Sequence, residues 1–290
     1  MLYGLSESYL GINFRPLDLP DDVAYTLIHN MCYFVFIKVD DGDDTVCGRC
    51  GTVGEGTTMY LMFTKPKVTA LSGTKVRTAV TSFLSTGAFR GTSPESAIWC
   101  ANVDESMYAQ LLCGLVRRDE VVCVGAIFAT VILRAVTFLE RIWRELCRDI
   151  SAGEARHGVL SDPAGRDAVN AIVARPDPEL ADAIAAECSA PSWRRIVRRL
   201  WPRAKYIEAI VTGSMVQCVP MLEFYGGGLP LVSTLYGSSE SYLGINLRPL
   251  DPPDDVAYTL IHNMCYFELI VTTYLHRYRH RQRRRGARPV

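Results

Sequence analysis

The chain has 290 residues, 49% of them apolar, and can bury the core of one large domain or two smaller ones, which excludes global disorder. Its 31 Lys and Arg residues balance 31 Asp and Glu residues, so no overall field attracts nucleic acid or an anionic membrane. The first residues form neither a basic leader nor a long apolar run, so we expect a cytoplasmic protein with reduced cysteines.

A near-identical repeat occupies residues 2–34 and 235–267. The copies differ at three of 33 positions, Leu5/Ser238, Phe14/Leu247 and Leu19/Pro252. Repeat architectures stack several copies at a short period, whereas unrelated sequence separates these two. We therefore interpret the repeat as a recent duplication and expect residues 1–39 to be poorly integrated into the domain.

An acidic and then Gly/Thr-rich stretch, residues 40–58, is almost free of apolar residues and predicts a linker. Within it, Cys47 and Cys50 have the spacing of a redox or zinc motif, but no second pair accompanies them, which favours a loop with two thiols. Three other cysteines lie inside apolar runs and are expected to be reduced core residues: Cys113, Cys123 and Cys218.

The main body, residues 59–271, begins with alternating short elements. Strands are predicted at Met59–Thr64 and Arg77–Phe83, and a helix at Asp104–Arg118. This helix places four apolar residues on one face: Met107, Leu111, Leu112 and Leu115.

The longest apolar run, Val121–Leu133, is too short to span a bilayer and is interpreted as a buried helix. It overlaps a longer predicted helix, Ala126–Ile150, whose first half is apolar all round. The second half turns four charged residues outward: Glu140, Arg141, Arg144 and Glu145.

Two more helices follow. Asp177 and Pro178 predict a helix start, with Asp as the cap and Pro in the first turn. The next helix is predicted to begin at Ser192, with apolar residues on one face (Trp193, Ile196, Val197 and Leu200) and arginines on the other (Arg194, Arg195, Arg198 and Arg199). Ordinary amphipathic packing is favoured for these arginines over a phosphate-binding patch.

The sequence from Lys205 onward predicts a strand, a helix, a Gly-rich break and a second strand, in that order. Ile207–Val211 and Leu231–Leu235 are predicted as neighbouring buried strands joined by a right-handed crossover. In such sheets ligands bind beyond the carboxyl ends of the strands. The second strand would deliver residues 236–240, of sequence YGSSE, to that edge.

Each residue type in this string suits a nucleotide. Tyr236 offers an aromatic face or edge to a purine, and Gly237 lets the backbone approach a ring or phosphate. The hydroxyl of Ser239 can donate to a phosphate oxygen. The carboxylate of Glu240 is a hard ligand suited to Mg²⁺, which takes one or two protein carboxylates.

The sequence around this string is IVTGSMVQCVPMLEFYGGGLPLVSTLYGSSESYLGINLRPL. It resembles the Gretchen Hagen family of plant acyl acid-amido synthetases, which conjugate auxin, indole-3-acetic acid, to amino acids. The resemblance extends through MYLMFTK and PDPELADAIAAECS and covers about residues 52–270. It implies an α/β fold: the partial large domain of a luciferase-like, adenylate-forming enzyme, with a mixed sheet flanked by helices.

The resemblance also implies the reaction and its site. A hormone carboxylate attacks the α-phosphate of ATP to give an acyl-AMP, which an amino acid then attacks. By the same resemblance, Tyr236, Gly237, Ser239 and Glu240 bind the nucleotide and Mg²⁺, with Glu240 as the catalytic residue. The pocket for the acid would comprise Leu235, Gly237 and Tyr242, although Tyr242 equally suits an ordinary strand aromatic.

We expect the family's Ser/Thr/Gly-rich phosphate loop, its hinge motif and its lid domain to be absent, because no string in the sequence matches them. A synthetase and a catalytically inactive remnant that folds partly or serves as a binding partner therefore stay open as alternatives. Residues 272–290 are Arg-rich and predict a solvated, disordered tail, with nucleic-acid contact as the lesser alternative. The expected partners are the small-molecule acid and the amino acid, without a membrane.

Overall fold

The structure is a computed structural model that describes residues 56–63, 91–156, 160–237 and 243–261 with their side chains. Outside these ranges it describes the backbone of Tyr242 and of seven short strands. These strands are β1 (Leu2–Leu5), β2 (Ser8–Ile12), β3 (Phe36–Lys38), β4 (Thr45–Cys47), β5 (Gly51–Thr52), β7 (Val68–Thr69) and β8 (Lys75–Val76).

Four parallel strands form the central sheet, in the order β11-β10-β9-β6. Their bounds are β6 Thr57–Leu61, β9 Val121–Phe128, β10 Tyr206–Ile210 and β11 Leu231–Val232. The prediction that two late strands neighbour each other is confirmed, because Ile207 is in register with Leu231. The 3-10 helix Gly213–Cys218 and helix α8 (Val219–Gly226) lie between them in the chain.

The predicted buried helix at Val121–Leu133 is wrong, because its first eight residues are the central strand β9. Residues Val121 to Ala126 are buried without a break, which places side chains on both faces of the sheet inside the protein. A parallel strand covered on both faces needs a continuous apolar run, and over such a run periodicity does not separate a strand from a buried helix.

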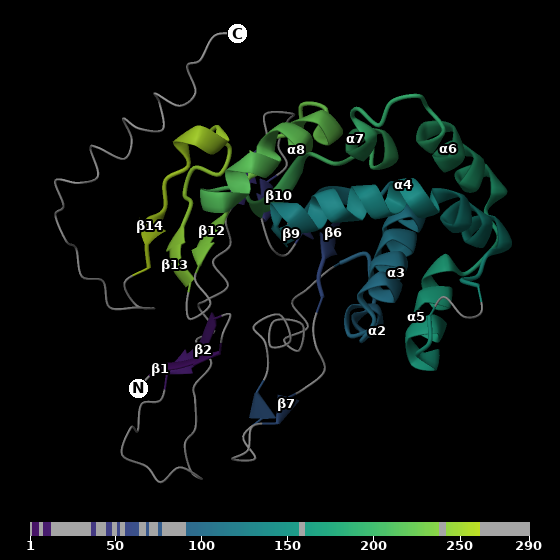
Figure 1. The fold of residues 1–290 in the computed structure, drawn as a ribbon, viewed down its shortest axis with the longest axis horizontal. Helices are drawn as coiled ribbons and strands as arrows, with labels where there is room; N and C mark the ends of the chain where they lie inside the picture. The colour runs from purple at the N-terminus through teal and green to yellow at the C-terminus, as the bar shows by residue number, and fades with distance from the viewer. Residues whose placement is uncertain are drawn as a thin grey trace.

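Seven α-helices are described, and their bounds are α2 Glu95–Ile98, α3 Val103–Val116, α4 Ala129–Ala152, α5 Pro163–Val173, α6 Pro178–Cys188, α7 Ile196–Leu200 and α8 Val219–Gly226. Helix α4 contacts β9, α3 contacts β6, and α8 contacts β11. Figure 1 shows α4 as the longest helix, running across the parallel strands, with α3 crossing it and α5 and α6 at the right-hand end of the helices.

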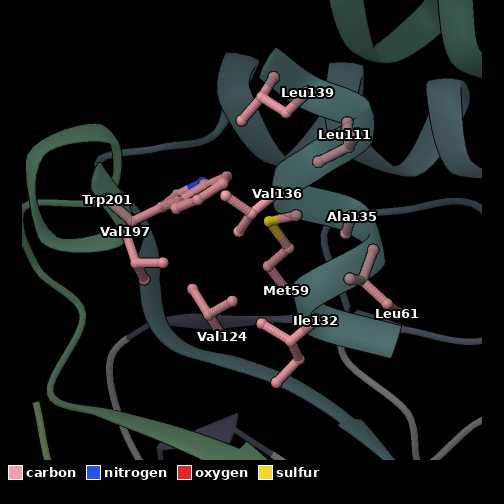
Figure 2. Close-up of a pocket in the computed structure, with 10 residues that line it drawn as sticks. All are labelled: Met59, Leu61, Leu111, Val124, Ile132, Ala135, Val136, Leu139, Val197 and Trp201. Atoms are coloured by element: carbon pink, nitrogen blue, oxygen red, sulfur yellow. The ribbon is translucent and has the colours of Figure 1, made fainter. Parts of the chain in front are cut away.

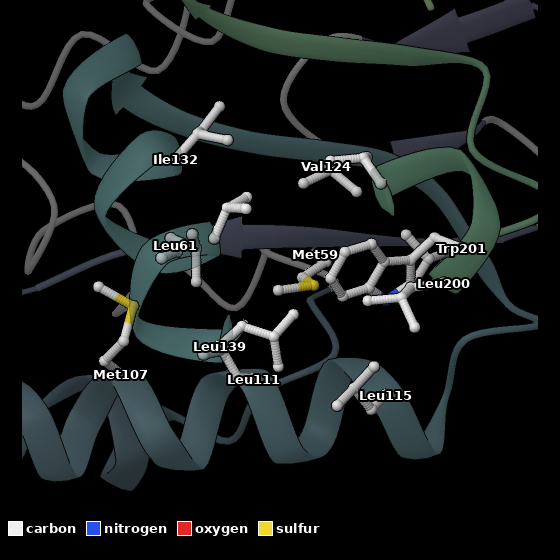
Figure 3. Close-up of a cluster of buried hydrophobic side chains, with 14 of the residues drawn as sticks. Met59, Leu61, Met107, Leu111, Leu115, Val124, Ile132, Leu139, Leu200 and Trp201 are labelled. Carbon is white, nitrogen blue, oxygen red and sulfur yellow. The ribbon is translucent and has the colours of Figure 1, made fainter. Parts of the chain in front are cut away.

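The core fills the space between the sheet and these helices. Figure 3 shows Met59 of β6 and Leu111 of α3 turned toward Leu139 of α4, with Trp201 closing one end. Trp201 is 2% exposed, and its indole N–H donates to the Gly114 carbonyl at 2.9 Å, so its one polar atom is satisfied. Burial of these side chains is the main favourable contribution to folding.

Helix α3 is buried on all sides rather than on one face. Every residue from Ser106 to Leu115 is buried, including the four apolar residues predicted to face the core. Its polar side chains find partners: the Gln110 amide exchanges hydrogen bonds with the Met62 backbone at 2.7 and 3.0 Å, and the Ser106 hydroxyl donates to the Ala97 carbonyl at 2.8 Å. These pairings make complete burial tolerable.

Helix α4 starts three residues later than predicted and is amphipathic from its first turn, with Thr130 and Arg134 exposed. The expectation of an all-apolar first half was therefore wrong, because the most apolar part of the run belongs to β9. Of the four charged residues predicted to face outward, three are exposed and Glu145 is partly exposed.

A buried polar group joins α3 to the end of α4. The Tyr108 hydroxyl donates to the Asp149 carboxylate at 2.5 Å, and Asp149 is 1% exposed. Arg156 pairs with the same carboxylate through Nε at 3.0 Å and its backbone N–H at 3.2 Å. Burial, followed by the hydrogen bond to Asp149, raises the pKa of Tyr108 well above its usual value.

The helix start at Asp177 is confirmed, since its side chain accepts the Leu180 N–H at 2.9 Å with Pro178 in the first turn. The start at Ser192 is wrong, because α7 begins at Ile196. Arg195 adopts a left-handed φ of 63° and donates its backbone N–H to Phe224 of α8 at 2.8 Å. Because the left-handed backbone of Arg195 is not helical, the helix does not extend back to Ser192.

Arg199 belongs to the packing rather than to an open basic face. Its Nε donates to the Glu187 carboxylate at 2.7 Å, and a second nitrogen donates to the Glu187 carbonyl. The predicted apolar residues Ile196, Val197 and Leu200 are buried. This arrangement agrees with amphipathic packing of the segment, the interpretation favoured over a phosphate-binding patch.

The predicted linker at residues 40–58 contains the strands β4 and β5 and the start of β6. Strands β3, β4 and β5 pair antiparallel, so Cys47 ends a strand instead of lying in a loop. The predicted strand Arg77–Phe83 and the tail at residues 272–290 lie outside the described residues. No helix in the described part of the chain is long and apolar enough to cross a membrane.

The cysteines singled out from the sequence are confirmed as core residues. Cys113 and Cys123 are 0% exposed and Cys218 is 5% exposed. Burial raises the pKa of the Cys113 thiol to about 12, so this thiol stays protonated and unreactive at neutral pH.

Candidate functional site

A small antiparallel sheet stands at the carboxyl edge of the parallel sheet. It has the order β12-β13-β14, with bounds Leu235–Gly237, Tyr242–Ile245 and Thr259–Leu260. Only Ser233 and Thr234 separate β11 from β12 in the chain, so the small sheet begins where β11 ends. Figure 1 shows its three strands beneath α8, away from α3 and α5. Carboxyl ends of parallel strands are where such folds bind ligands.

Strand alternation separates the first two residues of β12. Leu235 is 9% exposed and Tyr236 is 45% exposed. The ring of Tyr236 stacks on the ring of Tyr258, with centroids 5.4 Å apart and planes 28° apart. One face of Tyr236 is therefore covered, and its exposed part remains accessible to a planar ligand.

Tyr258 is held by the ends of two parallel strands. Its hydroxyl is 2.8 Å from the Ser233 hydroxyl, just after β11, and 3.3 Å from the Thr212 hydroxyl, just after β10. These hydrogen bonds connect the central sheet to the stacked pair, so Tyr258 positions the Tyr236 ring.

Gly244 makes this stack possible. It lies opposite Tyr236 in the β12–β13 ladder, and a Cβ placed on it would meet Cβ of Tyr258 at 2.9 Å and the Thr259 carbonyl at 3.2 Å. A larger residue would push Tyr258 away from its partners, so this position requires glycine.

Two buried polar residues close the junction between the sheets. Asn246, 1% exposed, donates its backbone N–H to the Thr234 carbonyl at 2.8 Å and its side-chain amide to the Ser233 carbonyl at 3.0 Å. The Thr234 hydroxyl donates to the buried carboxylate of Glu208 on β10 at 2.8 Å. Burial of the Cys123 thiol is the main cause that raises its pKa, and the nearby charge of Glu208 raises this pKa further.

The predicted site residues are placed to different degrees. Tyr236 and Gly237 are exposed at the carboxyl edge, whereas Leu235 is buried beneath them. Tyr242 lies in β13 opposite Gly237, and its side chain is outside the described part. Ser239 and Glu240 lie outside the described residues. Within the described part no group of three or more His, Cys, Asp or Glu residues is arranged to hold a metal.

Sequence reasoning missed the residues that hold the site together: Thr212, Ser233, Gly244, Asn246 and Tyr258. Hydroxyl and amide side chains are common in loops, so no local pattern marks them. The signal that could have found three of them is the repeat, because Gly244, Asn246 and Tyr258 recur as Gly11, Asn13 and Tyr25.

A cavity in the core is not a substrate site. It measures about 10 Å³ and is lined by the apolar side chains in Figure 2, among them Met59, Val124, Ala135 and Trp201. This is about the room for one water molecule, and the lining offers no polar partner, so the cavity stays dry and excludes a nucleotide or an acid.

Comparison with known proteins identifies the fold. Residues 47–231 match the GH3 family N-terminal domain. "Probable indole-3-acetic acid-amido synthetase GH3.13" of Oryza sativa subsp. japonica is 56% identical over 255 residues, which cover 84% of this chain and 52% of the relative. "Indole-3-acetic acid-amido synthetase GH3.17" of Arabidopsis thaliana is 48% identical over 254 residues, covering 84% of this chain and 40% of the relative.

A solved structure supports the same conclusion. "GH3.15 acyl acid amido synthetase" superposes with a TM-score of 0.70 at 45% identity, covering 74% of this chain and 39% of that chain. The chain thus spans about half or less of the length of these relatives. The resemblance to the Gretchen Hagen family is confirmed, and the chain belongs to the GH3 family.

Proposed function

We propose that this chain takes part in an ATP-dependent ligation that joins an acid, indole-3-acetic acid above all, to an amino acid. The observation that carries the proposal is the exposed Tyr236–Gly237 pair, presented at the carboxyl edge of the parallel sheet of a GH3 fold. The two curated relatives are named indole-3-acetic acid-amido synthetases, which supports the choice of acid. We place the protein in the cytoplasm.

The proposed roles of Tyr236 and Gly237 are supported by their exposure, and those of Ser239 and Glu240 by the family resemblance alone. Tyr236 presents its exposed ring to the adenine, with the opposite face supported by Tyr258. Gly237 leaves room for the nucleotide near the backbone. Beyond it, Ser239 would donate to phosphate oxygens and Glu240 would ligate Mg²⁺, one or two carboxylates being the usual protein share of such a site. Bound Mg²⁺ would offset the charge of the phosphates.

The acid pocket is proposed from the same strands. Leu235 is buried and would support the pocket from beneath, while Gly237 and Tyr242 pair across the two strands at its rim. The acid would react with ATP to give an acyl-AMP and pyrophosphate, and the amine of an amino acid would then displace AMP. With this chemistry, the fold class we propose is the large domain of a luciferase-like, adenylate-forming enzyme.

The test is pyrophosphate exchange into ATP in the presence of indole-3-acetate and Mg²⁺. We expect exchange above background, and Glu240→Gln should lower its rate about 100-fold, the usual effect of losing one group that stabilises the transition-state charge. Glu7→Gln is the matched control, because Glu7 is the equivalent residue of the first repeat copy. A folded chain without any exchange overturns the proposal and supports the inactive remnant.

A further inference from the structure

The two repeat copies form the same hairpin. Leu2 pairs with Ile12 in β1–β2, and Leu235 pairs with Ile245 in β12–β13. The register shifts at the same step in both, between Tyr3 and Gly4 and between Tyr236 and Gly237. Two hairpins with one register and one irregularity indicate that the local sequence dictates this structure wherever the segment occurs.

The second copy is bound to the rest of the domain by a small set of contacts. Asn246 donates twice to the backbone of Ser233 and Thr234, and the Tyr258 hydroxyl lies within hydrogen-bond distance of the Ser233 and Thr212 hydroxyls. Three apolar side chains of this copy are also buried: Leu235, Ile245 and Ile261.

The differences between the copies spare all of these contacts. Leu247 is 65% exposed and Pro252 is exposed, while Ser238 lies outside the described residues. Each contacting residue is identical in the first copy, where the counterparts are Leu2, Ile12, Asn13, Tyr25 and Ile28. The first copy thus carries every described group that attaches the second copy to the central sheet.

We propose that residues 2–28 compete with residues 235–261 for one surface, formed by Thr212, Ser233 and Thr234 at the carboxyl ends of β10 and β11. The occupant is this segment of the same chain. The second copy prevails in the structure because it follows Thr234 directly, which gives it the higher effective concentration at the surface. The first copy takes the surface when the attachment of the second is weakened.

Hydrogen exchange of the full chain, followed by mass spectrometry, tests the competition. Peptides from the two copies are distinguishable by mass at Leu5/Ser238 and Phe14/Leu247. The double variant Asn246→Ala, Tyr258→Phe removes the side-chain bonds of the second copy, which should speed its exchange about tenfold. Amides of residues 8–12 should become slower by a similar factor, and this reciprocal change is the expected result.

Matched substitutions in the first copy provide the control. Adding Asn13→Ala and Tyr25→Phe to the double variant should abolish the new protection, whereas these two changes alone should leave the second copy as it was. Protected amides in α3 verify that each variant is folded, and Tyr258→Phe alone replaces the double variant if they are lost. Unchanged exchange of residues 8–12 while the second copy loosens overturns the proposal. Protection that rises with protein concentration overturns the same-chain occupant.

Discussion

Removal of the Tyr108 hydroxyl tests the buried group that joins α3 to the end of α4. In Tyr108→Phe the ring stays in the core, but the carboxylate of Asp149 loses the donor at 2.5 Å. A hydrogen bond to a charged group contributes about 1.5–3 kcal/mol. Arg156 still donates to this carboxylate, so the penalty falls in the lower half of that range, at about 2 kcal/mol.

Urea unfolding monitored by circular dichroism measures this effect as a lower midpoint at unchanged slope. On heating, the same loss corresponds to a fall in Tm of roughly 4–8 °C. Tyr225→Phe is the matched control, because the described structure gives the Tyr225 hydroxyl no hydrogen bond, and its effect should stay within about 0.5 kcal/mol. If the two variants are equally stable, Asp149 does not depend on Tyr108 and the reasoning fails.

A double-mutant cycle strengthens the test. Arg156 is 40% exposed in its side chain, so Arg156→Gln alone should cost less than Tyr108→Phe. Together the two changes leave the buried carboxylate of Asp149 with one backbone donor. We expect the double variant to lose more unfolding free energy than the sum of the two single losses, by an amount on the order of 0.5 kcal/mol or more. Simple additivity would contradict a shared network.

Other expected outcomes concern the site, the core and pH. Gly244→Ala should displace Tyr258 and weaken ATP binding, measured by calorimetry, while leaving the urea midpoint of the core nearly unchanged; a wild-type affinity would refute the role of the stack. Leu111→Ala should cost about 2–5 kcal/mol of unfolding free energy, because it enlarges an existing cavity. Burial alone would raise the pKa of Glu105, but the hydrogen bonds from Ser161, Cys100 and Asn102 together outweigh it and lower the pKa below the ordinary 4.5. The stability that this carboxylate contributes is therefore present above about pH 4.5 and is lost as the pH falls through the lower pKa of the folded state. The difference in unfolding free energy between wild type and Glu105→Gln should accordingly shrink on acidification. A difference that persists unchanged at pH 3 would contradict the assignment.

Caps and buried faces were predictable because their causes are local. Asp177 and Pro178 start a helix through contacts within four residues, and the structure keeps them in those roles. The boundary between β9 and α4 was not predictable in the same way. A run that is apolar throughout suits a strand covered on both faces and a buried helix equally, and its neighbours β6 and β10 decide between them.

Tertiary contacts also overrode local preference at α7. The sequence from Ser192 has helical periodicity, but Arg195 donates its backbone N–H to α8 and turns left-handed, so the helix starts later. For the candidate site, Tyr236 and Gly237 are exposed in β12, whereas their role in binding a nucleotide stays a prediction. The supporting residues Tyr258 and Asn246 escaped it, because their partners lie in other strands and loops.

The sequence by itself determined the family, the parallel pairing of the last two core strands and the identity of the exposed residues that follow them. It also determined the hairpin of each repeat copy, since pairing and register within one segment depend on neighbouring residues. Only the tertiary structure decided which copy attaches to the central sheet and what holds Tyr236 in place. Those outcomes depend on hydrogen bonds and packing between residues distant in the chain, which local sequence does not encode.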